Sequence, residues 1–562
     1  MRAIGILLGL MSLCAHAQIR DFDPDGKDSF APDSLAEECH HNSVFLFHDF
    51  KVLCADNFHQ YKSTTSVSSR RSKPSTIRIG EFNALHPGMG KTRFKDYYRL
   101  ARVINQYDVI GVTELIPLVS SDLRNNENVL DFIQEAPQAI AQVKREIEEL
   151  EQRIQRARRV TNEMRTELRL LRKMLSELED DKKDAASLYR LPGYLRILKE
   201  LHSMPGGKSW SLILSPRGEG SELTSTPELV GYYYRSDLVQ PKDNSYCKSI
   251  NKTSNNLSFA CIVNMDKTDL GSDKSKYFAR RPFLAQFRAG NFEFVTLTSH
   301  ILYDSPSEDA RMIPILRAAF GVRDHTVLGT GLNKETYARF AEVKMTLDFI
   351  QRYKRKFTRV KDIIYLGDFN LEMDNQFWPN VLRSWSGAKL YISQPTSIKE
   401  DYWTSSGERS NGLSSNYDHI IFDPDQTREC LKANGRINGG ALNFLQGSIA
   451  ESIDRKYRVR YKYNGLGNIR INKRKYDQIK EAFVDPYFTG AKNIVTIGRK
   501  YITVGRQRKL SQGIIVDERE TEEFGSFFQE RVIDSQLTTD RFYNYFQELI
   551  SDHLPVYVDC KI

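Results

Sequence analysis

Short apolar runs that each stop at a polar residue recur along the chain and predict buried strands. The clearest run covers residues 363–367 and leads directly into Asp368 and Asn370. An apolar run that ends in Gly and then Asp-x-Asn is typical of a buried strand whose end turns polar side chains into a cleft. Asp368 and Asn370 are two residues apart, so on a strand they share one face. Gly-Asp-x-Asn also makes ordinary turns, and the motif alone does not exclude that interpretation.

Further runs of this kind are separated by stretches of helical spacing, which are clearest at residues 97–106 and 337–353. Apolar or alternating runs of this length, bounded by polar residues, predict strands. They cover residues 77–83, 108–114, 210–214, 228–235, 283–287, 292–300, 416–422 and 551–556.

Residues 140–178 follow a strict heptad pattern, with apolar residues three and four apart and almost solid Glu, Arg, Lys and Gln between them. This pattern predicts a coiled-coil helix, about 58 Å long if it is continuous at roughly 1.5 Å per residue. A narrow apolar seam needs a partner, which is either the same helix in a second copy of the chain or another helix of this chain. Of the two we expect self-association into a homo-oligomer, through an insertion at residues 137–184.

The first residues of the chain predict export. A basic start and a short apolar segment at residues 4–13 precede a small-x-small site that ends at Ala17. The apolar segment is too short to span a bilayer, so residues 1–17 are typical of a cleaved signal peptide. We therefore expect a secreted or periplasmic protein with no stable membrane association. Residues 18–75 follow as an N-terminal arm of poorly ordering composition.

Removal of the signal peptide takes away one of the seven cysteines, and an even number in an exported protein permits disulfides. The pairings that need the least chain closure are Cys39–Cys54 and Cys247–Cys261, which leaves Cys430–Cys560. Other connectivities remain open, because spacing does not choose among them. The chain has no Cys-x-x-Cys pair, which argues against a structural zinc site.

Basic residues outnumber acidic ones. Arg2 lies in the expected signal peptide. Without it, 80 of the 81 Lys and Arg remain against 72 Asp and Glu, so the mature chain would have a net charge of +8 with neutral His. This charge permits the binding of a polyanion without requiring it. Within residues 426–547, the segment 455–475 places nine Lys or Arg among three tyrosines. That composition suits a polynucleotide with unstacked bases, and a small β-rich domain with a solvated basic face explains it equally well.

The strand-like runs end on side chains that can bind a metal ion, transfer a proton or orient an anion. Carboxylates suit a hard cation, histidines suit proton transfer, and amides can orient an anion. A lone histidine is more often structural than catalytic, but here two histidines end runs whose neighbours end in Asp or Asn. The residues are Asn83, Glu114, His300, Asp368, Asn370, Asp418, Asp552 and His553.

Eight motifs occur in the order found in the endonuclease/exonuclease/phosphatase superfamily, which the chain resembles, most of all in its deoxyribonuclease I branch. They are Glu-Phe-Asn83, Tyr-Asp-Val-Ile-Gly-Val-Thr-Glu114, Tyr-Tyr-Tyr-Arg235, Arg280-Arg-Pro282, Ser-His300, Gly-Asp368-Phe-Asn370, Tyr-Asp418-His-Ile and Ser-Asp552-His553-Leu-Pro-Val. The resemblance implies a four-layer α/β sandwich of two packed mixed sheets. Residues 76–136, 185–425 and 548–562 would form it, with the coiled coil and residues 426–547 as insertions.

The resemblance also implies a divalent cation at the edge of the sandwich. Glu114 would hold Mg²⁺, or Ca²⁺ or Mn²⁺ in its place, with Asn83 and Asp552 nearby. For proton transfer, His553 would be the general base, oriented by Asp418. His300 would be the acid that protonates the leaving oxygen, and a carboxylate from Glu228 would lie behind it.

Contacts to the substrate follow from the same resemblance. Asp368 and Asn370 would position the attacking water and the scissile phosphate. Arg280 would contact phosphate, with Arg281 as the alternative, and Asn83 would lie close to both metal and substrate.

The implied activity is that of an exported, metal-dependent nuclease that cleaves DNA, with RNA as an alternative substrate, and with little sequence preference. Residues 115–117 depart from the pattern, because Leu-Ile-Pro stands where deoxyribonuclease I carries basic residues for the minor groove. Two other functions remain open. One is a phospholipid phosphodiesterase of the sphingomyelinase type, which shares the catalytic residues, and the other is a non-catalytic coiled-coil assembly protein.

Overall fold

The computed structural model describes most of the residues that the motifs single out. The described ranges are 74–87, 95–116, 120–157, 159–185, 192–215, 228–250, 258–264, 277–278, 280–301, 309–357, 359–399, 410–449 and 550–562, with Tyr543, Phe546, Gln547 and the strand segments 45–48, 51–53, 458–463, 494–499, 507–510, 513–516 and 527–534. The proposed signal peptide and both Cys39 and Cys54 lie outside these ranges.

The first of two large sheets has eight strands. β3 and β4 run parallel, whereas the other neighbouring strands are antiparallel, so the sheet is mixed. In spatial order the strands are β14 (Gly439–Ala441), β20 (Val556–Lys561), β3 (Thr76–Asn83), β4 (Val109–Leu115), β6 (Leu229–Arg235), β5 (Trp210–Leu214), β1 (Phe45–His48) and β2 (Lys51–Leu53).

The second large sheet has seven strands, and it is mixed because β10 and β11 run parallel. In order they are β12 (Lys389–Tyr391), β13 (Asp418–Phe422), β11 (Asp362–Asp368), β10 (Phe292–His300), β9 (Phe283–Ala289) and β7 (Gln240–Pro241), with β8 (Ala260–Ile262) also paired to β9.

The two sheets pack face to face around one apolar core. Val109 and Tyr232 of the first sheet belong to the same buried cluster as Phe287 of the second. At one point the sheets approach so closely that a Cβ added to Gly111 would lie 2.3 Å from Thr298 Oγ1. Glycine at this position of β4 therefore allows β10 to lie against it.

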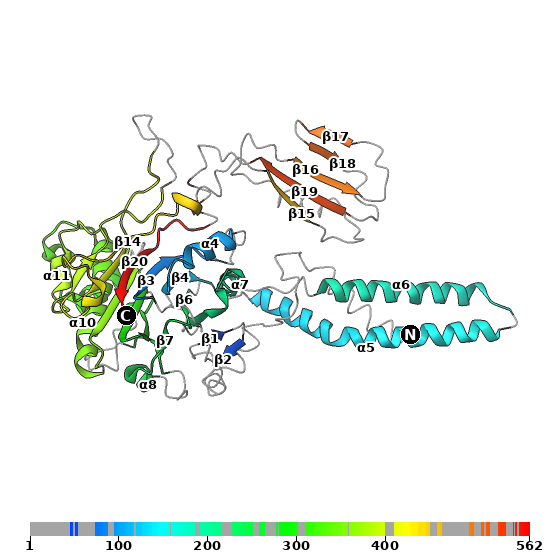
Figure 1. The fold of residues 1–562 in the computed structure, drawn as a ribbon, viewed down its shortest axis with the longest axis horizontal. Coiled ribbons are helices and arrows are strands. Elements are labelled where there is room, and N and C mark those ends of the chain that lie inside the picture. The colour runs from blue at the N-terminus through cyan, green and yellow to red at the C-terminus, as the bar shows by residue number, and fades with distance from the viewer. Residues whose placement is uncertain are drawn as a thin grey trace.

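Helices cover the outer faces of both sheets (Figure 1). The first sheet packs its outer face on α4 (Tyr97–Ile104) and α7 (Gly193–Ser203), and the second on α9 (Asp309–Phe320), α10 (Lys334–Lys356) and α11 (Trp378–Leu382). α4 buries Tyr97, Leu100, Ala101 and Ile104, the spacing of one helical face. The predicted four-layer α/β sandwich of two mixed sheets is confirmed.

Residues 140–178 do not form one continuous helix, the condition on which the predicted length of about 58 Å depended. The chain turns back between α5 (Ser120–Arg156) and α6 (Asn162–Ala185), which lie side by side as a hairpin (Figure 1). Ion pairs join Lys144 to Glu179 at 2.8 Å and Glu151 to Arg172 at 2.7 Å, so the helices run antiparallel. Heptad positions still meet, because Val143 and Ile147 cluster with Leu178. The apolar seam of α5 therefore packs against α6 of the same chain, which is the second of the two alternatives given above.

Part of the range assigned to the basic insertion belongs to the sandwich. β14 pairs with β20, and Phe444 and Leu445 are buried against the first sheet. The remaining described strands of that range pair only with one another, in sheets of three and two strands. They are β15 (Arg458–Tyr463), β16 (Ile494–Arg499), β17 (Gln507–Leu510), β18 (Gly513–Val516) and β19 (Phe527–Asp534).

Two of the three predicted disulfides are confirmed. Cys247 is bonded to Cys261, and Cys430 to Cys560. The second bond ties η7 (Arg428–Cys430) to β20, the second strand from one edge of the first sheet. In the part of the chain that the structure describes, no helix is long and apolar enough to cross a bilayer.

The two disulfides are expected to differ in their contribution to stability. They close loops with sequence separations of 130 and 14 residues. In the chain-entropy view the longer loop contributes about 4 to 5 kcal/mol and the shorter about 3. The pair of substitutions Cys430→Ala and Cys560→Ala should therefore lower the free energy of unfolding more than Cys247→Ala with Cys261→Ala. Guanidinium unfolding of both variants measures this, and an equal or reversed order would contradict it.

Candidate active site

Four strand ends converge at one edge of the sandwich. β3 ends at Asn83 and lies parallel to β4, which carries Glu114 close to its end. In the other sheet β10 ends at His300, directly beside Asp368 at the end of β11. Carboxyl ends of parallel strands meet at the same edge of a sheet, and here two such edges face each other.

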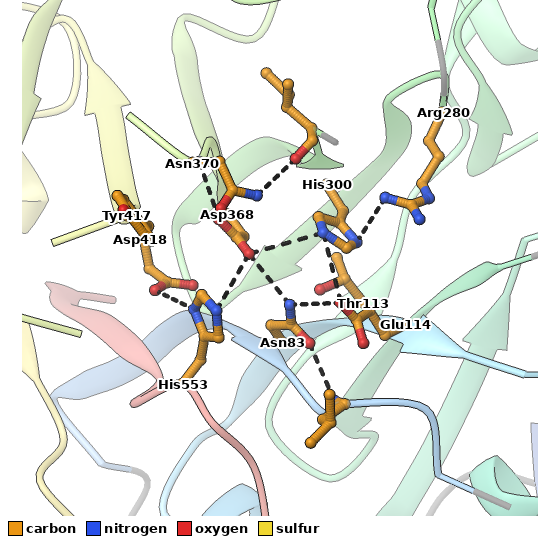
Figure 2. A network of polar contacts seen from close by, with 12 residues as sticks. Asn83, Thr113, Glu114, Arg280, His300, Asp368, Asn370, Tyr417, Asp418 and His553 are labelled. Atoms are coloured by element: carbon orange, nitrogen blue, oxygen red, sulfur yellow. Dashed lines mark hydrogen bonds and ion pairs between the residues drawn. The ribbon is translucent and has the colours of Figure 1, made fainter. Parts of the chain in front are cut away.

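Asn83 links the two sheets at this edge. Its amide nitrogen donates one hydrogen bond to Glu114 Oε1 at 2.9 Å and another to Asp368 Oδ2 at 3.1 Å. Figure 2 shows Asp368 in the middle of the network, with a histidine on either side. Asp368 Oδ2 lies 3.7 Å from His300 Nε2 and 3.6 Å from His553 Nε2. Residues from positions 83 to 553 thus form one cluster.

His553 is held by Asp418. His553 Nδ1 lies 2.8 Å from Asp418 Oδ2, and the Asp418 carboxylate is fully buried. Because a carboxylate only accepts, Nδ1 carries a proton and Nε2 faces Asp368. Burial alone would lower the pKa of His553, but the negative charges of Asp418 and Asp368 and the hydrogen bond raise it well above its usual range.

His300 is held in the same way by Glu228. His300 Nδ1 lies 3.0 Å from Glu228 Oε2 and 3.1 Å from Arg280 Nη1, and Arg280 also donates to Glu228. Nδ1 must donate to the carboxylate, so it cannot also accept from the guanidinium. Burial and Arg280 lower the pKa of His300, but the Glu228 hydrogen bond and the charge of Glu114 outweigh them and raise it. Burial would raise the pKa of Glu228, yet its hydrogen bonds to His300 and His86 hold it well below its usual range.

Three further predicted residues lie around this cluster. Asn370 accompanies Asp368, but its amide nitrogen donates to the backbone oxygen of Ile301 at 2.7 Å. Arg280, and not Arg281, reaches His300 and Glu228. Asp552 precedes His553, and its Oδ1 is buried without a hydrogen-bond partner in the structure.

Two sets of side chains have ligand atoms close enough together to hold a metal ion. Among the described residues they are His86, Glu114 and Glu228, and Asp368, Asp418 and His553, with all ligand atoms of a set within 4.8 Å of one another. In the second set His553 and Asp418 are already hydrogen-bonded to each other. In the first set Glu114 Oε2 is buried and lacks a hydrogen-bond partner. The chemistry at Glu114 therefore fits a divalent cation.

Sequence reasoning missed His86 and Lys95, because neither ends a strand. His86 lies in the loop after β3, and its Nε2 is 3.1 Å from Glu114 Oε2. The buried Lys95 donates to the backbone oxygen of Ile550 at 2.7 Å and so fixes the segment that leads to His553. In that segment Ser551 Oγ donates to the Asn83 carbonyl at 2.5 Å. Ser551 was part of a recognised motif, whereas no pattern marked His86 or Lys95.

No family model and no curated protein matches the chain. Solved structures similar to it include a humanized D. rerio TDP2, with 9% identity and a TM-score of 0.29 over 87% of this chain and 100% of that one. An endonuclease/exonuclease/phosphatase from Bacteroides vulgatus has 11% identity and a TM-score of 0.30, over 62% and 88%. The human nocturnin catalytic domain with bound sulfate has 10% identity and a TM-score of 0.27, over 63% of this chain and 84% of that one.

Lys95 gives the site a pH-dependent stability. Burial lowers the pKa of Lys95 to about 7, although Asp552 and Glu114 oppose this. An unfolded lysine keeps its proton up to about pH 10.4. Between about pH 7 and pH 10 the unfolded state therefore binds more protons, and the free energy of unfolding rises with pH.

Lys95→Met should remove that rise. Urea unfolding of the wild type and the variant in the presence of chelator, at pH values across this window, measures the difference. Parallel pH profiles for the two proteins would contradict the assignment.

Proposed function

We propose that this protein is an exported, metal-dependent nuclease that hydrolyses the phosphodiester bonds of DNA. One observation carries the proposal: two histidine–carboxylate pairs face the same carboxylate, Asp368, from either side, beside Glu114. His553 Nε2 and His300 Nε2 lie 3.6 Å and 3.7 Å from Asp368 Oδ2. Hydrolysis of a phosphodiester needs one proton taken from water and one given to the leaving oxygen, and two opposed histidines can supply both.

In its neutral form, with the proton on Nδ1, His553 takes the proton of the attacking water at Nε2, because Asp418 fixes this tautomer and stabilises the imidazolium that forms. The bond from water oxygen to phosphorus forms while the bond to the leaving oxygen breaks. His300, protonated and oriented by Glu228, gives its Nε2 proton to that leaving oxygen. Asp368 accepts from the water and holds it in line, while Asn370 fixes the turn around it.

A divalent cation, when bound, supplies a Lewis acid that offsets the charge gathering on the phosphate. Glu114 would hold it, with Asn83 and Asp552 nearby, and we expect Mg²⁺, with Ca²⁺ or Mn²⁺ as substitutes. Arg280 lies against Glu228 and His300, and its guanidinium offers further donors to a phosphate oxygen. Arg281 is the adjacent alternative.

DNA is the proposed substrate, and RNA the alternative. The net charge of the chain, +9 for the full sequence and +8 without Arg2 of the expected signal peptide, and the basic, tyrosine-containing segment 455–475 support a polynucleotide. A membrane-directed lipid phosphodiesterase would need an exposed apolar hairpin, and the exposed large apolar side chains among the described residues are four scattered ones, Tyr98, Leu170, Ile313 and Val327.

Removal of either histidine should abolish the reaction without unfolding the protein. His300→Ala and His553→Ala should each lower the rate of plasmid nicking on the order of 10²–10⁴-fold, because each loses one proton transfer. His325→Ala is the matched control, since His325 packs against Tyr337 in the second sheet's helical layer. Circular dichroism checks the fold. Near-wild-type nicking by either variant would remove that histidine from the mechanism.

The substrate class is tested by a panel. Purified protein is incubated with supercoiled plasmid, linear DNA, RNA and sphingomyelin, with Mg²⁺ and with chelator. Nicked circles that appear with Mg²⁺ and disappear with chelator are expected. Release of choline phosphate without nicking would identify a lipid phosphodiesterase instead, and unchanged nicking in chelator would exclude the cation.

A further inference from the structure

His86 lies beside the proposed cation site and comes from outside every motif. We infer that His86 Nε2 is a ligand of the cation held by Glu114, which gives this centre one nitrogen among its oxygen ligands. The inference rests on the proposed role of Glu114 and adds to it a higher binding affinity for Mn²⁺ and related transition metals than for Mg²⁺, whichever ion is used in the reaction.

The distances fit one ion. His86 Nε2 lies 3.1 Å from Glu114 Oε2 and 3.3 Å from Glu228 Oε1. Two ligands at right angles on a cation, with bonds of about 2.1 Å, lie roughly 3.0 Å apart, and opposite ligands roughly 4.2 Å apart. The ligand atoms of these three residues all lie within 4.8 Å of one another. An ion can therefore be held with little movement of the side chains.

One carboxylate oxygen of Glu114 lacks a hydrogen-bond partner, and a cation would bind it. Glu114 is only 8% exposed, and its Oε1 accepts from Asn83. Its Oε2 has no hydrogen-bond partner in the structure, although His86 Nε2 lies 3.1 Å away, because the His86 hydrogen bond goes to Glu228. A buried carboxylate oxygen without a partner is costly. A cation that takes the place of the His86 Nε2 proton, with the ring proton on Nδ1 instead, would bind both Glu114 Oε2 and His86 Nε2 and remove that cost.

Glu228 has less to give an ion than Glu114. Its Oε2 accepts from His300, and its Oε1 is shared by Arg280 and His86. Glu114 and His86 are therefore the residues that bind the ion directly. Glu228 lies beside them and contributes negative charge.

The backbone conformation around His86 directs its side chain toward Glu114. Leu85, His86 and Glu114 have φ values of 49°, 48° and 58°, in the left-handed region that side chains disfavour. Such residues are strained and persist only where the surrounding structure fixes them. Here Asn83 Oδ1 accepts from the backbone nitrogen of Leu85 at 3.0 Å and closes the turn that brings His86 over Glu114.

A nitrogen ligand changes which metal is favoured. Mg²⁺ prefers oxygen ligands and retains water, whereas imidazole suits first-row transition metals, and affinity rises from Mn²⁺ towards Cu²⁺. With His86 in place, Mn²⁺ should bind more tightly than Mg²⁺. Without it, this advantage should shrink.

Pulsed electron paramagnetic resonance on the full chain loaded with Mn²⁺ tests the inference directly, because a coordinated imidazole nitrogen modulates the Mn²⁺ echo. We expect this modulation in the wild type and in the control variant His325→Ala, and its loss in His86→Ala. Calorimetry should show that His86→Ala weakens Mn²⁺ binding on the order of 10-fold or more and Mg²⁺ binding less. Thermal unfolding checks that the variant is folded.

Other outcomes overturn the inference. A wild-type spectrum without nitrogen modulation would exclude a histidine ligand, and modulation that survives in His86→Ala but disappears in His300→Ala would assign the nitrogen to His300. Failure of the proposed function has a different signature. If Glu114→Gln binds Mn²⁺ like the wild type, the cation does not lie at Glu114, and if the wild type binds Mn²⁺ through His86 but cleaves no nucleic acid, only the activity is wrong.

Discussion

The carboxamide of Asn83 is the contact on which the site depends. It uses both of its hydrogens, one on Glu114 from its own sheet and one on Asp368 from the other. Two carboxylates that face each other across a sheet interface would repel, and a neutral group with two donors keeps them apart while holding them in place. The close approach at Gly111 allows the sheets to come near enough for this bridge to form.

Both histidine pairs have the same construction. Each one joins a residue of one sheet to a residue of the other: His553, just before β20, is held by Asp418 of β13, and His300 of β10 is held by Glu228, just before β6. Neither pair can form within a single sheet. The tautomers of the two rings, and therefore their ability to move protons, are a property of the packed sandwich and not of any local segment.

The ends of the strands could be predicted from the sequence because each apolar run is buried in the core. The polar residue that follows the run therefore marks the place where the strand reaches the edge of the sheet. The sequence could not predict His86, whose position depends on two left-handed residues, nor the tertiary contact of Lys95 with Ile550. The folded-back course of residues 140–178 could not be predicted for a different reason. The turn between Arg156 and Asn162 keeps the heptad phase, so one long helix and a folded hairpin have the same pattern of apolar positions.

The order of strands in the first sheet has a consequence for biosynthesis. β20 lies between β14 and β3, so the strand that carries Asn83 gains its neighbour on that side only after the chain has been made as far as residue 561. A nascent or prematurely terminated polypeptide that stops before residue 553 has one histidine pair and no second. Such a fragment would lack one of the two proton-transfer pairs of the proposed mechanism, so the proposed activity would arise only after translation has passed β20.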